Sequence, residues 1–283
     1  MRRPFRGFRG NVASTSREVK AILRALGLRP RKSLSQNFLV NPRVARQMLG
    51  AVDPDMATLE IGGGLGALSV PLCAKLRGRF LTVEIDTRLV DYLRRVLESP
   101  KCEVLCADAL SIEWNFEQVV STVPYHLTSE LIVKLVRSND VRRAVLVLQR
   151  EVAQRLLSEP GTRSYGRLTA LVRSTFNVRA GPLVRPSDFL PRPEVFSQVV
   201  LLERHTPYNA SIRALEELTK RIFSQRNRRA HKVLMEHLKL DEQAIRAMGV
   251  SEAARVRDLS PEVLLRLAEH ALGNTRYSST GSP

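Results

Sequence analysis

Apolar residues in the central part of the chain follow two alternating patterns. Short continuous apolar runs predict buried strands at Ala57–Ile61, Phe80–Ile85, Cys102–Cys106, Gln118–Thr122 and Arg143–Gln149. Between these runs, apolar residues recur every three or four positions, which predicts helices at Ala67–Leu76, Leu89–Leu97 and Ser129–Val136. Strands that alternate with helices at this spacing are typical of an α/β fold with a parallel, doubly wound sheet.

The pattern changes on both sides of this central part. Two further strands, near Asn177–Leu183 and Phe196–Glu203, are suited to an antiparallel hairpin at the sheet edge. A short amphipathic helix is expected at Ser16–Leu26, and a second helix after Asn41-Pro42. Beyond His205 only helices are predicted, at Ser211–Phe223, Arg229–Leu238, Asp241–Met248 and Pro261–Leu272. We therefore predict a basic N-terminal arm with a short helix (1–31), an α/β domain (32–204), a small all-helical domain (205–273) and a loose tail (274–283).

Charge adds a partner to this picture. The 283 residues contain 45 Lys+Arg against 28 Asp+Glu, a net charge of +17. Such a charge favours a polyanionic partner, above all nucleic acid, although an arginine-rich proteome or simple solubility is the alternative. No apolar run approaches the ~18 residues of a membrane span, so we expect a cytoplasmic protein without membrane contact, and a monomer by default. The first 15 residues are arginine-rich and acid-free, which predicts a flexible basic arm, with a mitochondrial transit peptide as the alternative.

Three cysteines are too few for a disulfide scaffold and favour a reducing compartment. Cys102 and Cys106 lie two strand repeats apart, so both are expected on one face as buried thiols. No metal site is predicted, because further ligands are absent from the neighbouring sequence.

Candidate chemistry follows the first three strands. Gly62 and Gly64 form a glycine-rich turn that lets the backbone approach a ligand. Glu84 ends the second strand and is placed to accept from two ribose hydroxyls; taken alone, a glutamate there is more typical of a solvated acid. Asp108 follows the third strand, where a carboxylate can accept from the exocyclic amine of an adenine or can simply form a turn.

The turn after the fourth strand distinguishes between ligand classes. Thr122-Val123-Pro124-Tyr125 places an aromatic plate and a backbone carbonyl together. A nicotinamide dehydrogenase needs no such turn, whereas an enzyme that methylates an exocyclic amine needs a stacking surface for the base and acceptors for its hydrogens. A proline-rich turn with a core tyrosine is the plain structural alternative.

At this point the chain resembles the S-adenosylmethionine-dependent adenine dimethyltransferases of small-subunit ribosomal RNA. The resemblance runs from about Lys32 to about Leu238. It is carried in order by Lys32–Leu39, Glu60–Leu68, Val83–Asp86, Ala107–Leu110, Pro124-Tyr125, Tyr165–Leu168, Phe189–Val195 and Phe223–Arg226.

The resemblance implies a Rossmann-like methyltransferase sheet, S-adenosylmethionine as cofactor, and methyl transfer to the N6 amine of adenines, two adjacent ones, in a ribosomal RNA hairpin during ribosome biogenesis. The cofactor-binding positions it implies are Asn37, Leu39, Gly62, Gly64, Glu84, Asp108 and Thr122, and the catalytic positions are Thr122, Pro124 and Tyr125. Thr122 replaces an asparagine of the family pattern, so transfer of two, one or no methyl groups stays open. Gly63 stands where the family usually has proline.

RNA contact is predicted for a basic cluster after Phe223 and for the N-terminal arm. The cluster comprises Arg226, Arg228, Arg229 and Lys232. A non-catalytic ribosome-assembly or mitochondrial transcription factor on the same scaffold is the alternative function, and a nicotinamide dehydrogenase is a third.

Overall fold

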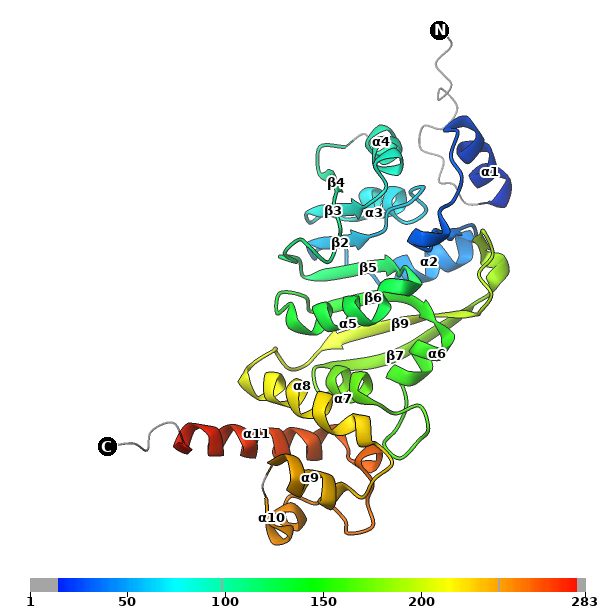
Figure 1. Ribbon diagram of the computed structural model, residues 1–283. Coiled ribbons are helices and arrows are strands. Elements are labelled where there is room, and N and C mark those ends of the chain that lie inside the picture. The colour runs from blue at the N-terminus through cyan, green and yellow to red at the C-terminus, as the bar shows by residue number, and fades with distance from the viewer. Residues whose placement is uncertain (1–14, 98, 239, 279–283) are drawn as a thin grey trace. The chain divides into compact units, whose positions relative to one another are not determined.

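A computed structural model describes residues 15–97, 99–238 and 240–278 of the chain (Figure 1). The predicted N-terminal arm up to residue 14 lies outside these residues. The strands are β1 (Phe38–Leu39), β2 (Thr58–Ile61), β3 (Phe80–Glu84), β4 (Cys102–Cys106), β5 (Gln118–Thr122), β6 (Arg143–Gln149), β7 (Phe176–Val184), β8 (Phe189–Leu190) and β9 (Ser197–Arg204). The helices are α1 (Ser16–Ala25), α2 (Pro42–Gly50), α3 (Ser69–Lys75), α4 (Thr87–Val96), α5 (Thr128–Arg137), α6 (Arg150–Leu156), α7 (Arg167–Arg173), α8 (Ala210–Ile222), α9 (Ala230–Leu238), α10 (Glu242–Ala247) and α11 (Pro261–Ser278).

Seven strands form one sheet in the order β4-β3-β2-β5-β6-β9-β7. The first five are parallel, as predicted, and β9 runs antiparallel to β6. Their continuous apolar runs reflect burial on both faces of the sheet. The strand order reverses on either side of β2, and open α/β sheets hold their ligands at the carboxyl ends of the strands at such a point. The topology alone therefore places a site beside the turn after β2.

One hydrophobic core joins α2, α3 and α4 to the sheet. Its members include Val44 and Met48 from α2, Leu72 from α3 and Leu93 from α4, together with apolar residues of β3, β5 and β6. A smaller apolar cluster holds α1 in place. In this cluster the buried side of α1, formed by Val19, Ile22 and Leu23, is joined by Phe38, Val40, Leu65, Leu89 and Tyr92. Thr15 caps this helix by accepting from the Glu18 N–H, so α1 has a defined start as well as a buried face.

The chain divides into two compact units. One comprises residues up to 153 together with 179–203, and the other comprises 154–178 together with 204 onward. The helical unit thus includes a segment, with α7, that lies before the predicted boundary at residue 205. Its last helix continues to Ser278, past Asn274, where the predicted tail begins; 279–283 lie outside the described residues. The Gly273-Asn274 pair, typical of a helix end, does not end α11.

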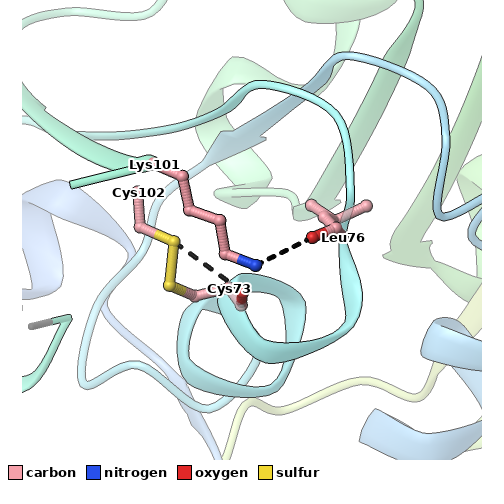
Figure 2. Close-up of a disulfide and its surroundings, with 4 residues drawn as sticks. All are labelled: Cys73, Leu76, Lys101 and Cys102. Carbon is pink, nitrogen blue, oxygen red and sulfur yellow. Dashed lines mark hydrogen bonds between the residues drawn. A yellow bond between two sulfur atoms is a disulfide. The ribbon is translucent and has the colours of Figure 1, made fainter. Parts of the chain in front are cut away.

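Cys102 is buried as predicted, but the prediction of two buried free thiols is wrong. Cys73 in α3 and Cys102 at the start of β4 form a disulfide, with Cα atoms 5.8 Å apart (Figure 2). Cys106 is a free thiol and is exposed rather than buried. Lys101 reinforces the junction by donating to the Leu76 carbonyl, 3.1 Å away. The error arose because α3 brings together two residues 29 positions apart, a contact that spacing along one strand does not reveal.

No helix among the described residues is long and apolar enough to cross a membrane.

Candidate active site

A cavity of about 250 Å³ opens at the carboxyl ends of β2, β3, β4 and β5. It brings together all the residues predicted to bind the cofactor and two of the three predicted catalytic residues, Thr122 and Pro124. These lining residues are Asn37, Leu39, Gly62, Gly64, Glu84, Asp108, Thr122 and Pro124. Tyr125, the remaining catalytic candidate, lines a smaller adjoining cavity.

The glycine turn forms the floor of the larger cavity. Gly62 and Gly64 have φ angles of 78° and 54°, in the left-handed region that side chains disfavour. A Cβ at Gly62 would meet nothing, so that backbone faces open space, while at Gly63 it would lie 2.4 Å from Thr82 Oγ1. The departure from the family pattern at Gly63 therefore matches a tight contact with β3.

Glu84 connects the second strand to this turn. One carboxylate oxygen accepts from the Gly64 N–H at 3.0 Å, and the other accepts from the Asp86 N–H at 3.0 Å. Burial raises the pKa of Glu84, against the lowering effect of these backbone hydrogen bonds. Each carboxylate oxygen has further lone pairs, so the group can still accept from a ligand diol.

Glu60, which is not among the predicted site residues, is a second buried acid on the cavity wall. It is 2% exposed, and its Oε2 has no hydrogen-bond partner among the described residues. Burial raises the pKa of Glu60 to about 7, the Ser69 and Thr82 hydroxyls lower it, and the charge of Glu84 raises it further. A buried carboxylate with a free oxygen is suited to a cationic ligand group. Its position two residues before Gly62, in the strand that leads into the glycine turn, is the feature of the sequence that could have identified it.

Asp108 forms a turn and also lines the cavity. Its Oδ1 accepts from the Leu110 N–H at 2.8 Å, which forms a turn after β4. The residue also lines the cavity, so its second oxygen is available to a ligand.

The segment from Ser35 to Asn37 closes one side of the cavity through bonds to distant parts of the chain. Ser35 Oγ lies 2.9 Å from His126 Nδ1, and Gln36 Nε2 donates to Asp86 Oδ2 at 3.0 Å. Asn37 uses its amide to donate to the Ser35 carbonyl at 3.1 Å. These bonds fix the segment between the turns that follow β3 and β5.

The predicted catalytic turn lies where the two cavities meet. Thr122 lines both cavities, and its hydroxyl forms no hydrogen bond within residues 15–97, 99–238 and 240–278. The Pro124 carbonyl accepts from the Leu127 N–H at 3.0 Å, which leaves one of its lone pairs. Tyr125 is half-buried, and burial raises its pKa.

Two residues outside the predicted site lie beside Tyr125 or its cavity. Its hydroxyl lies 2.7 Å from Ser197 Oγ, and Ser197 is fully buried at the start of β9. Phe189, also buried, lines the same small cavity. The ring is thus held by the antiparallel part of the sheet, 72 residues further along the chain.

The predicted RNA-binding residues lie in the helical unit and are largely engaged within it. Arg226 donates to the carbonyls of Thr162 and Arg163, and Arg229 donates to the Glu252 carbonyl. Arg228 pairs with Glu236 at 2.7 Å. Lys232 is exposed and has no partner among the described side chains.

Comparison with known proteins assigns this geometry to a family. The profile described as "Ribosomal RNA adenine dimethylase" matches residues 27–271. "Probable ribosomal RNA small subunit methyltransferase A" of Methanothermobacter thermautotrophicus is 34% identical, over 89% of this chain and 95% of its own length. "Ribosomal RNA small subunit methyltransferase A" of Idiomarina loihiensis is 34% identical, over 87% and 91%.

Solved structures agree on the fold. The 23S rRNA methyltransferase ErmE is 29% identical with a TM-score of 0.66, covering 83% of this chain and 99% of its own. A dimethyladenosine transferase from Plasmodium falciparum gives a TM-score of 0.74 at 24% identity, covering 84% and 98%. The predicted Rossmann-like methyltransferase fold is therefore confirmed.

Proposed function

Since the chain belongs to the ribosomal RNA adenine dimethylase family, we propose that it transfers methyl groups from S-adenosylmethionine to adenine N6 amines in a hairpin of small-subunit ribosomal RNA. Two adjacent adenines are the proposed targets, and the step belongs to ribosome biogenesis. A monomer acting in the cytoplasm, where small subunits assemble, completes the proposal.

The acceptor groups of the larger cavity suit S-adenosylmethionine. Glu84 offers lone pairs to a ribose diol, Asp108 offers one oxygen to an adenine amine, and the free Oε2 of Glu60 offers a charge to the cationic amino acid part. The open backbone at Gly62 gives room for close approach, and Asn37 and Leu39 close the opposite wall. When bound, the cofactor supplies a methyl group on a positively charged sulfur.

The groups around the smaller cavity suit the reacting end of a base, while the cavity itself, at about 10 Å³, has room for about one water molecule and would have to open to admit a base. Tyr125 provides the ring on which an adenine stacks, which is worth about 1–3 kcal/mol. The Thr122 hydroxyl lines both cavities, and the Pro124 carbonyl belongs to a residue that lines the larger one; the hydroxyl and the remaining lone pair of this carbonyl accept the two amine hydrogens. These acceptors orient the amine, and because an adenine amine is barely basic, no strong base is needed to prepare it. Positioning and electrostatics therefore carry the reaction.

One observation supports this assignment above the others: Ser35, Asn37 and Thr122 line both cavities. A methyl donor in the larger cavity and a base against Tyr125 would therefore meet at Thr122. RNA contact away from this point is proposed for the exposed Lys232 and for the unused guanidinium donors of Arg226, Arg228 and Arg229.

Nucleoside mass measurement tests the function. A small-subunit ribosomal RNA transcript is incubated with protein and cofactor, digested to nucleosides, and its adenosines are weighed. We expect methylated adenosine with the wild type and a loss of about ten-fold or more with Tyr125→Ala, from the lost stacking. Thr122→Asn adds a longer carbonyl acceptor and is expected to raise the fraction carrying two methyl groups.

The same measurement addresses the non-catalytic alternative, which the short reach of Thr122 motivates. A wild type that binds the transcript and leaves its adenosines unmethylated, while Thr122→Asn methylates them, would assign the natural protein to a binding role.

A further inference from the structure

The segment from 15 to 50 carries an unusually one-sided charge. It contains eight lysines and arginines against a single acid, Glu18. All eight basic side chains are exposed: Arg17, Lys20, Arg24, Arg29, Arg31, Lys32, Arg43 and Arg46. None of them pairs with a carboxylate in the part of the chain that the structure describes. Their charges are therefore available to a partner.

Three of these side chains form a stripe along α1 (dark blue in Figure 1). Arg17, Lys20 and Arg24 are spaced by three and four positions, which places them on one side of a helix. The opposite side of α1 carries the buried residues Val19, Ile22 and Leu23. We call Arg17, Lys20 and Arg24 the basic stripe.

The buried side of α1 packs on the wall of the larger cavity. Its apolar residues share one cluster with Phe38, Leu65 and Leu89, and all three of these line the cavity. The helix therefore stands between the cofactor cavity and solvent, with its charge directed outward. The chain between α1 and the residues that line the cavity contains three more exposed basic residues, Arg29, Arg31 and Lys32.

We infer that the basic stripe of α1 is a docking surface for the phosphate backbone of the substrate RNA, next to the site where the base is delivered. The inference rests on the proposed function, which makes RNA the substrate. A stripe from Arg17 to Arg24 spans about 10 Å at the helical rise of about 1.5 Å per residue. Along the axis of a duplex, one strand places a phosphate about every 3.4 Å, so this length is enough for about three phosphates.

The test compares two triple variants with the same change in net charge. Arg17→Gln/Lys20→Gln/Arg24→Gln removes the stripe and keeps good helix formers in α1. The control, Arg77→Gln/Arg142→Gln/Arg179→Gln, removes exposed arginines of the same unit that already pair with Asp55, Glu117 and Glu203. Arg77 and Arg142 lie just before β3 and β6, at the ends of the strands away from the cavity.

Binding of a small-subunit ribosomal RNA transcript is measured over a range of KCl concentrations. Each lost phosphate contact reduces the magnitude of the slope of log K against log salt by about 0.7–0.9. The slope of the stripe variant is therefore expected to be smaller than that of the wild type by about 2. Its affinity at 0.1 M salt should fall by about ten-fold or more, while the control keeps the wild-type slope. Cofactor affinity, measured by calorimetry, should be equal in all three proteins.

Equal losses in the two triple variants would overturn the inference, because net charge alone would then explain them. A stripe variant with wild-type RNA affinity would also overturn it, and would direct the stripe to another partner such as an acidic protein. Failure of the proposed function looks different: the wild type itself would leave the transcript unmethylated, whatever the slopes.

Discussion

The carboxyl edge of the sheet and the helical unit use polar side chains in opposite ways. At the carboxyl ends of the strands, Glu60 has a buried oxygen without a hydrogen-bond partner, and Thr122 has a hydroxyl without one, among the described residues. Both residues line the larger cavity. In the helical unit, Arg226 and Arg228 satisfy carbonyls and a carboxylate of their own unit. Unpaired buried polar groups cost stability, whereas paired ones hold a structure together. We therefore expect substitutions in the two regions to have opposite consequences.

The same contrast separates the two basic regions. The arginines after Phe223 form the denser cluster in the sequence, yet most have internal partners. The stripe on α1 is sparser and has none among the described residues. Charge in a sequence therefore indicates where a polyanion can bind only after the internal partners are known.

The largest expected effect is on stability and concerns the disulfide, which offsets the cost of unpaired polar groups near the cavity. The Cys73–Cys102 disulfide joins α3 to the first residue of β4, at the strand end away from the cavity. Closing a loop of this length stabilises a fold by about 3–4 kcal/mol in the chain-entropy account. Cys73→Ser/Cys102→Ser should lose about this much in urea unfolding and keep its cofactor affinity. Cys106→Ser, at the free exposed thiol, is the control and should match the wild type. An equal loss of cofactor affinity would contradict a separation between stability and site.

The next effect measures how much stability the buried carboxylate of Glu60 costs. Because the pKa of Glu60 is raised from 4.5 to about 7, the folded state holds this proton more tightly than the unfolded state. Stability is therefore lost as the pH rises from about 4.5 to about 7, by about 3 kcal/mol. Glu60→Gln mimics the protonated acid at every pH. It should be more stable than the wild type by about this amount at pH 8, and the two proteins should converge toward pH 4.5.

Cofactor binding gives the opposite sign for the same substitution. A neutral amide offers no charge to a cationic ligand group, so Glu60→Gln should bind S-adenosylmethionine about ten-fold or more weakly. Calorimetry at pH 8 measures this, and unfolding at several pH values measures the stability. A variant with unchanged stability at pH 8 would remove Glu60 from the list of groups that cost stability for binding.

Much of the fold could be predicted from the sequence, because parallel strands buried on both faces leave continuous apolar runs. The bounds of β4, β5 and β6 agree with the predicted ones residue by residue. Glu84 and Asp108 line the cavity together, as their positions at the end of β3 and after β4 predict, because the carboxyl ends of these strands meet. What the sequence could not provide are contacts between distant segments. The bonds of Ser35 to His126 and of Cys73 to Cys102 join residues 91 and 29 positions apart, with no local pattern to mark them.

A smaller effect tests the helical unit. Arg226→Ala removes a charged donor from the Thr162 and Arg163 carbonyls, so we expect a loss of about 1–2 kcal/mol in unfolding free energy. Lys232→Ala is the matched control, because this exposed side chain has no partner among the described residues. It should leave stability unchanged and reduce the salt slope of RNA binding by about 0.7–0.9. The comparison breaks if Arg226→Ala keeps its stability and weakens RNA binding as Lys232→Ala does.

The smallest effect concerns a hydrogen bond behind the predicted catalytic turn. The Tyr125 hydroxyl is paired with buried Ser197, and this bond fixes the ring that faces the smaller cavity. Removing it by Ser197→Ala should cost about 1 kcal/mol of stability and raise the pKa of Tyr125 further, because burial already raises it and Ser197 opposes that shift. A double-mutant cycle with Tyr125→Phe isolates the pair, and the double variant should lose less than the sum of the single variants. If Ser197 positions the ring for stacking, methyl transfer should fall in kcat while cofactor affinity stays constant. Strict additivity of the two substitutions would show that the hydroxyl pair is not coupled.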